Sequence, residues 1–161
     1  MAWTEIETQT LTTTAASVVF STGLSGYKFF RLTGYVLNDG VGNNEVLLRL
    51  NNSSSGYTTQ AIEAASTAVQ GARATATSAE VTGFQNFAAS QAGSFVAIIA
   101  KPAAGVEAQI VSQAGYNTTI VLALAGSEWN NTADLISRID VIASSNNFAA
   151  GTSILLEGLS Y

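Results

Sequence analysis

Residues 128–161 read EWNNTADLISRIDVIASSNNFAAGTSILLEGLSY, and this segment carries most of the information in the chain. Apolar and polar residues alternate through residues 134–143 and again through 152–159, which is the two-residue period of half-buried strands. The residues between these two segments are mostly Ser, Asn, Ala and Gly, a composition typical of a turn. The stretch therefore predicts a strand, a polar turn and a final strand.

Short alternating segments of the same kind recur along the whole chain and are separated by turn residues. This pattern is typical of a sandwich or barrel, and no alternation of helices with strands supports an α/β fold. We expect one all-β domain over residues 1–161, an antiparallel β-sandwich of roughly eight to ten strands, with residues 1–14 as an extended N-terminal arm or strand. The expected strands are residues 5–12, 18–20, 29–37, 45–51, 72–77, 95–100, 107–112, 118–124, 134–143 and 152–159.

Three local signals refine this prediction. Asn38-Asp39-Gly40 is a tight-turn sequence, which predicts that residues 29–37 and 45–51 form a hairpin. Ala61, Ile62 and Ala65 have rough helical spacing, so residues 59–70 are the one short helix we expect. Residues 95–100 are almost continuously apolar, which predicts a strand covered on both faces and ended by Lys101-Pro102.

The composition is poor in charge and bounds the function. Of 161 residues only 11% are charged, the net charge is −5, and the six basic residues are scattered. A nucleic-acid partner needs a basic stripe, so we expect none. The opening residues resemble no secretory signal, and no apolar run approaches the roughly 20 residues of a membrane span, so we expect neither. A surface of hydroxyl and amide groups suits packing against further copies or another protein.

Catalytic chemistry has few candidates. The chain has no Cys and no His, which removes disulfides, thiolate ligands and the Ser-His-Asp and Cys-His arrangements. Carboxylate pairs remain: Asp134 with Asp140, and Glu5 with Glu7, each expected on one face of a strand. Acids on solvent faces explain both pairs more simply, and the oxygen-rich residues 38–45 read as a turn rather than a cation site. We expect no enzyme, no catalytic residues, no cofactor and no metal.

Aromatic and arginine side chains are the candidates for an interface. Arg31 and Arg49 lie inside predicted strands, where each would face solvent or pair with an acid at a subunit boundary. Trp3 and Trp129 would pack at the edge of the core or stack on sugar rings. The candidate interface residues are Trp3, Arg31, Arg49, Tyr57 and Trp129.

Several motifs resemble those of a family of tailed-phage virion structural proteins. The closing segment has an Ile/Ser-rich strand, the turn Asn147-Phe148-x-x-Gly151-Thr152 and an end at Leu156-x-Gly158-Leu159. The family's Leu-x-x-Arg-Phe-Asn-x-Asp-x-Gly-x-Tyr stretch resembles residues 47–57, with Leu50 in place of Phe and with Ser53 and Ser54 where Asp is common. The resemblance covers both ends and much of the first third of the chain, and residues 60–125 match poorly.

The resemblance implies a jelly-roll-like sandwich in a virus particle. Its most specific implication is a capsid decoration (cement) protein of a bacteriophage, assembled in the host cytoplasm, that stabilises the head through self-association, as a homotrimer, and through contacts with the major capsid protein. The alternative is a tail, collar or fibre component with a carbohydrate-binding surface. That surface would use Tyr57, Tyr116 and Trp129 on end loops to bind host glycans.

Overall fold

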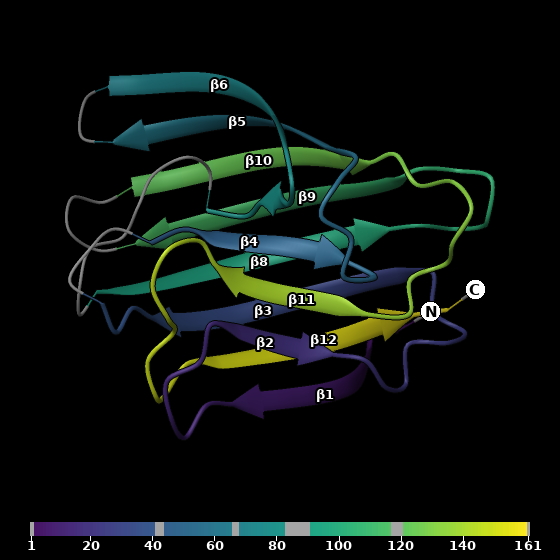
Figure 1. Cartoon of the computed structure of the whole chain (residues 1–161), viewed down its shortest axis with the longest axis horizontal. Coiled ribbons are helices and arrows are strands. Elements are labelled where there is room, and N and C mark those ends of the chain that lie inside the picture. Colours follow the sequence, from purple (N-terminus) through teal and green to yellow (C-terminus); the bar gives the residue numbers. More distant parts are fainter. Residues whose placement is uncertain (1, 41–43, 66–67, 83–90, 117–120, 161) are drawn as a thin grey trace.

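Two antiparallel sheets packed face to face form the molecule (Figure 1). The computed structural model describes residues 2–40, 44–65, 68–82, 91–116 and 121–160, and these contain strands but no helix. The strands are β1 (Thr4–Thr10), β2 (Ser17–Phe20), β3 (Phe29–Leu37), β4 (Val46–Leu50), β5 (Tyr57–Ala65), β6 (Ala68–Ala76), β7 (Ala79–Glu80), β8 (Ala92–Ala100), β9 (Ala108–Tyr116), β10 (Val121–Trp129), β11 (Ile139–Ala143) and β12 (Ser153–Leu159).

The two sheets differ in size. The larger has the order β1-β12-β3-β8-β9-β10-β5-β6, and the smaller has the order β2-β11-β4-β7. In Figure 1 the smaller sheet lies in front of the larger one, and β5 and β6 extend past β4 at the top of the view. The antiparallel β-sandwich that the sequence predicts is confirmed, with twelve strands in the described residues rather than eight to ten.

Alternating side chains of both sheets meet in a single core. In β3 and β8, for example, Phe30, Leu32, Phe95 and Ile99 point toward the smaller sheet and are buried. The smaller sheet contributes the inward-facing residues of β2, β4 and β11 to this core. These residues are Val18, Phe20, Val46, Leu48, Leu50, Ile139 and Val141. Burial of these apolar side chains is the main source of stability, at roughly 1.5–3 kcal/mol for each large side chain.

A glycine on β3 makes room for an aromatic ring of the neighbouring strand β8. Gly34 lies opposite Phe95 in the ladder, and a Cβ at Gly34 would overlap the Phe95 ring. The absence of a side chain at position 34 therefore gives the ring its place in the core.

The loop after β4 joins two segments that are far apart in the sequence. Asn51 and Asn52 both have φ of +54°, a left-handed conformation that Asn adopts more readily than most residues. The Asn51 side chain accepts hydrogen bonds from the backbone N–H of Ser137 at 2.8 Å and of Arg138 at 3.1 Å. Asn51, which lies in the motif at residues 47–57, thus fixes the loop to the segment that leads into β11.

The predicted helix at residues 59–70 is wrong. These residues lie in β5 and β6, which pair in register from Tyr57 with Ala76 to Ala65 with Ala68, and residues 66–67 lie outside the described part. Alanine favours a helix, but β5 also carries Thr58 and Thr59 and pairs with β10 along its whole length. Sheet pairing therefore overrides local propensity.

The predicted hairpin of residues 29–37 with 45–51 is also wrong. The strand β3 belongs to the larger sheet and β4 to the smaller one, so the intervening segment crosses between the layers. At the start of this crossing the backbone N–H of Asn38 donates to Gln91 O at 3.1 Å. A turn sequence specifies a change of direction and not the sheet that the chain enters next, which is why the prediction failed.

Two strand predictions need smaller corrections. The strand at residues 95–100 is covered on one face only, because Val96 and Ile98 on the other face are 41% and 42% exposed. Its end at Lys101-Pro102 is as predicted. In the segment 134–143 only Ile139–Ala143 forms a strand. Of residues 1–14, Thr4–Thr10 form β1, which pairs with β12 at the edge of the larger sheet.

Candidate functional site

The larger sheet exposes an apolar surface on the side that faces away from the smaller sheet. We call this surface the outer face. The ladder places Ile98 opposite Val111 and Leu124 opposite Ile62, so exposed aliphatic side chains of neighbouring strands lie side by side. The exposed large apolar residues of the outer face on β3, β8, β9, β10 and β5 are Tyr35, Ile62, Val96, Ile98, Val111, Leu122 and Leu124.

Charges on the outer face lie toward its two sides. Arg31 and Glu157 lie on β3 and β12, and Arg73 lies on β6. Across the outward positions of β8, β9, β10 and β5, Glu128 is the one charged residue that the structure describes. Wide exposed apolar surfaces are uncommon on monomeric proteins and mark sites of contact with another molecule.

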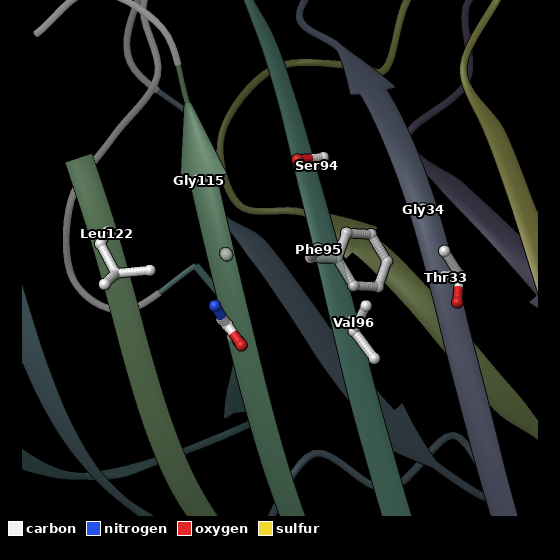
Figure 2. Close-up of a pocket in the computed structure, with 9 residues that line it drawn as sticks. Thr33, Gly34, Ser94, Phe95, Val96, Gly115 and Leu122 are labelled. Atoms are coloured by element: carbon white, nitrogen blue, oxygen red, sulfur yellow. The ribbon is translucent and has the colours of Figure 1, made fainter. Parts of the chain in front are cut away.

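One hollow in the outer face lies over β9. It has a volume of about 390 Å³ and is lined by side chains of Thr33, Ser94, Val96, Gln113 and Leu122. Figure 2 shows Val96 on β8 and Leu122 on β10 on either side of the strand that carries Gly115. Gly115, which has no side chain, is one of the residues that line this hollow.

A second, more polar hollow of about 300 Å³ lies around Gly126 on β10. A Cβ at Gly126 would have no atom within 4 Å, so the glycine forms an open floor. The side chains around it belong to Thr58, Gln60, Arg73, Gln109, Val111 and Glu128. This hollow therefore offers both hydrogen-bond donors and acceptors, whereas the rest of the outer face is mainly aliphatic.

Two of the predicted interface residues lie together at the β1 side of the larger sheet. The Arg31 guanidinium donates to both carboxylate oxygens of Glu157, at 2.6 and 2.8 Å, and its carbon lies 4.8 Å from the centre of the Trp3 ring. The hydrogen bond from Arg31 lowers the pKa of Glu157 below its usual value. Arg31 thus has an acidic partner within its own chain.

Arg49 lies on the smaller sheet, remote from Arg31. Its Nε donates to Thr77 O at 3.1 Å, and the ladder places Asp140 opposite it on β11. Asp140 is paired with Arg138, whose Nη2 lies 2.6 Å from Asp140 Oδ1. The predicted arginines therefore do not form one surface.

Tyr57 and Trp129 lie in the core. Their exposures are 0% and 1%, and the rings stack with centres 6.2 Å apart at 15°. The backbone N–H of Leu50 donates to the Tyr57 hydroxyl at 2.7 Å, and burial raises the pKa of Tyr57 to about 12. Neither ring is available to a partner or to a sugar. Of the two predictions for Trp129, packing in the core is therefore confirmed and stacking on a sugar ring is wrong. The Tyr116 side chain lies outside the described part of the structure.

The predicted carboxylate pairs do not share faces. Asp134 is in a loop, where its carboxylate accepts a hydrogen bond from Asn131 at 2.8 Å, while Asp140 is on β11. A bulge lies between Glu5 and Glu7, so Glu5 faces outward with Glu157 and Glu7 turns to the opposite side of β1. A bulge inserts one residue and reverses the facing of the residues after it, an effect that alternation alone does not reveal.

The structure reveals buried acids that the sequence did not indicate. Glu80 is 7% exposed, and its Oε2 has no hydrogen-bond partner in the described structure. Burial, followed by the charges of Glu45 and Glu63, raises the pKa of Glu80 to about 8. Glu63 alternates with Ala61 and Thr59 on the buried face of β5, a signal hidden by the helix prediction. Among the residues described, no three His, Cys, Asp or Glu side chains are placed to hold a metal ion.

The described residues include no helix that is long and apolar enough to cross a bilayer. No protein-family model matches the chain, and no curated protein matches it. Among solved structures, the chain is similar to the CBM2 module of the evolved Dit of Lactobacillus casei BL23 phage J-1, with 9% sequence identity and a TM-score of 0.24. The match covers 90% of this chain and 70% of that chain, and at this TM-score it carries no inference about function.

Proposed function

We propose that this protein is a non-enzymatic structural subunit of a bacteriophage virion, most specifically a capsid decoration protein. The observation that carries the proposal is the outer face, a broad surface of exposed aliphatic side chains on which Glu128 is the one described charge across β8, β9, β10 and β5. The motif resemblance to tailed-phage virion proteins supports the same assignment. The protein would be assembled onto the particle in the host cytoplasm and would stabilise the head by contact with capsid subunits and with its own copies.

The chemistry of the outer face suits permanent contact with a protein surface. Burying Val96, Ile98, Val111 and Leu124 removes apolar area from water, at roughly 25 cal/mol for each Å². Few charged groups lie at the centre of the outer face. Burying this face therefore costs little free energy for the desolvation of unpaired ions. The two hollows would receive side chains of the capsid subunit, which gives the contact its register.

The test is cryo-electron microscopy of the particle that encodes this chain, together with rebinding of purified protein to heads that lack it. The double variant Val111→Lys and Leu124→Lys places two charges on the outer face and is expected to abolish rebinding. Leu135→Lys is the matched control, because Leu135 is an exposed loop residue 58% accessible and outside the outer face. Absence of density for the chain from the particle, or equal rebinding of the double variant, would overturn the proposal.

The polar hollow around Gly126 favours a second candidate, a tail, collar or fibre component that binds carbohydrate. Amide, guanidinium and carboxylate groups around this hollow match the hydroxyl groups of a sugar. Gly126→Trp should fill the hollow without strain and abolish binding on a glycan array, while Gly71→Trp on β6 should not. Density confined to the tail, with glycan binding lost in Gly126→Trp, would establish this candidate in place of head decoration.

A further inference from the structure

The two edges of the larger sheet are built differently. At one edge, β1 contains a bulge between Glu5 and Glu7, and it carries both of these acids. Bulges and charges are the usual devices that stop a sheet edge from pairing with another strand. At the other edge, β6 pairs with β5 over nine residues without a register shift and contains no Pro and one charge, Arg73. Among the described edge strands of the larger sheet, β6 alone therefore lacks a bulge and acidic residues against a further strand.

The strand β6 is also uncovered on both sides. Residues 69–73 are all exposed, although successive residues of a strand point to opposite faces. Val69, at 72%, is the most exposed of the large apolar residues that the structure describes. The smaller sheet reaches β10 and β5 through β7 but leaves β6 beyond it (Figure 1). Among the described strands β6 has one neighbour, β5, and its residues gain little from burial, so a second neighbour would stabilise it.

We infer that β6 pairs antiparallel with β6 of a second copy of this chain, across a twofold axis that passes between the two Ala72 residues. The larger sheets of the two copies then form one continuous sheet. The exposed edge of β6 supplies unpaired backbone N–H and C=O groups, which an extended strand satisfies and a side chain does not.

The sequence of β6 is complementary to itself in this register. Pairing about Ala72 puts Arg73 opposite Gly71 of the second copy, so the one large charged side chain lies beside a residue with no side chain. It also puts Val69 opposite Thr75, a pair of β-branched residues, which favours cross-strand packing. The remaining pairs are Gln70 with Ala74 and Ala68 with Ala76, and none of these residues is charged.

The strand β1 of a second copy is the alternative partner for the β6 edge. The structure of β1 disfavours this pairing. Pairing β6 with β1 of the next copy would meet the bulge at Glu5 and Glu7 and would leave an open edge at each end. Contacts of that kind produce rings or filaments, whereas a twofold contact closes as a dimer. The inferred dimer differs from the homotrimer that the motif resemblance implies, and the two are distinguished by mass.

A cysteine placed on the axis tests the contact directly, because the natural chain has no Cys. Residues that face each other in an antiparallel pair have Cα atoms about 4.5–5.5 Å apart. A disulfide needs about 4.4–6.8 Å. Ala72→Cys should therefore give a covalent dimer on mild oxidation. Gln70→Cys is the matched control on the same strand and face: its two copies would lie four residues apart along the strand, about 13 Å, and should stay uncrosslinked.

Solution mass completes the test. The unmodified protein is expected at twice the chain mass by light scattering, and Ala72→Lys, which places two like charges opposite each other, should reduce it to the chain mass. Thr8→Lys on β1 should leave the dimer intact, and circular dichroism of each variant confirms that it is folded. A trimer, a monomer at all concentrations, or equal crosslinking at positions 70 and 72 would overturn the inference. The position of the chain on the virion is measured separately, so the dimer and the proposed function fail independently.

Discussion

The two ends of the larger sheet show how the same ladder is stabilised in different ways. At the β1 end, Arg31 holds Glu157 with two hydrogen bonds, Trp3 lies over the Arg31 guanidinium, and Gln9 donates to Val19 O of the smaller sheet at 2.7 Å. At the β6 end the backbone pairing has no register shift, whereas β1 contains a bulge, yet Val69 and its neighbours on β6 are exposed. Regular pairing does not by itself show where stability lies, because burial and side-chain contacts differ so much between the ends.

The largest expected effect is on the free energy of unfolding, and it distinguishes a buried residue of β10 from an exposed residue of β6. Trp129→Ala removes a fully buried ring stacked on Tyr57 and should lower the free energy of unfolding by about 3–5 kcal/mol. In the monomeric Ala72→Lys background, Val69→Ala on β6 should change it by less than about 0.5 kcal/mol, since the Val69 side chain of the single chain is exposed to solvent. Urea denaturation of both variants measures the contrast, and similar losses would show that β6 is packed as tightly as β10.

A pair of glycine variants sharpens the same comparison. Gly34→Ala forces a methyl group into the Phe95 ring and should destabilise the fold by about 1–3 kcal/mol. Gly71→Ala is the control on β6, where the nearest atom to a Cβ is Ala61 O at 3.8 Å, and a change within about 0.5 kcal/mol is expected. If Gly34→Ala melts at the same temperature as the wild type, the inferred overlap of a Cβ at position 34 with the Phe95 ring is wrong.

Glu80 predicts how stability depends on pH. Its pKa is about 8 in the folded protein, against an ordinary value of 4.5. Below pH 4.5 the carboxyl is neutral in both the folded and unfolded states. Between pH 4.5 and 8 the unfolded chain loses the proton that the folded chain keeps, so the free energy of unfolding falls as the pH rises through this window and is lowest above it.

Glu80→Gln tests this dependence, because an amide of similar shape does not titrate. At pH 8 the variant should be about 1–3 kcal/mol more stable than the wild type, and near pH 4 the two should differ little. Urea denaturation across this range measures the difference, with Glu5→Gln on the exposed β1 edge as the control. A constant difference at all pH values would mean that burial does not hold the Glu80 proton in the folded protein.

The smallest effect concerns the arginines of the two ends. Arg31→Ala removes the ion pair with Glu157 and should lower the melting temperature slightly, by an amount that shrinks in high salt. Arg73→Ala should leave the melting temperature unchanged at any salt concentration, because Arg73 forms no ion pair with a described residue. Equal shifts of the melting temperature in the two variants, independent of salt, would show that the Arg31–Glu157 ion pair does not stabilise the β1 end.

The candidate site was only partly predictable from the sequence. The low content of charged residues predicted a surface that packs against other proteins, and the structure shows an outer face of exposed apolar side chains, whose contact with a partner stays a prediction. Trp3 and Arg31 were named and lie together, but Arg49 lies on the other sheet, and Tyr57 and Trp129 are in the core. A strand sequence shows two alternating faces and does not say which one the second sheet covers, because in β10 both Leu124 and Trp129 are large and apolar.

Alternation along the chain determined the fold class by itself, because a two-residue period is a local property of a half-buried strand. It located β2, β3, β4 and β12 closely, and it overlapped β9 and β10, although both expected strands ended several residues too early. That β3 pairs with β8 and β12 instead of β4, and that residues 59–65 and 68–70 lie in strands, is visible in the folded chain and not in local sequence. Partner choice depends on packing between segments far apart in the sequence, and that packing also buried Glu80 and left the β6 edge open.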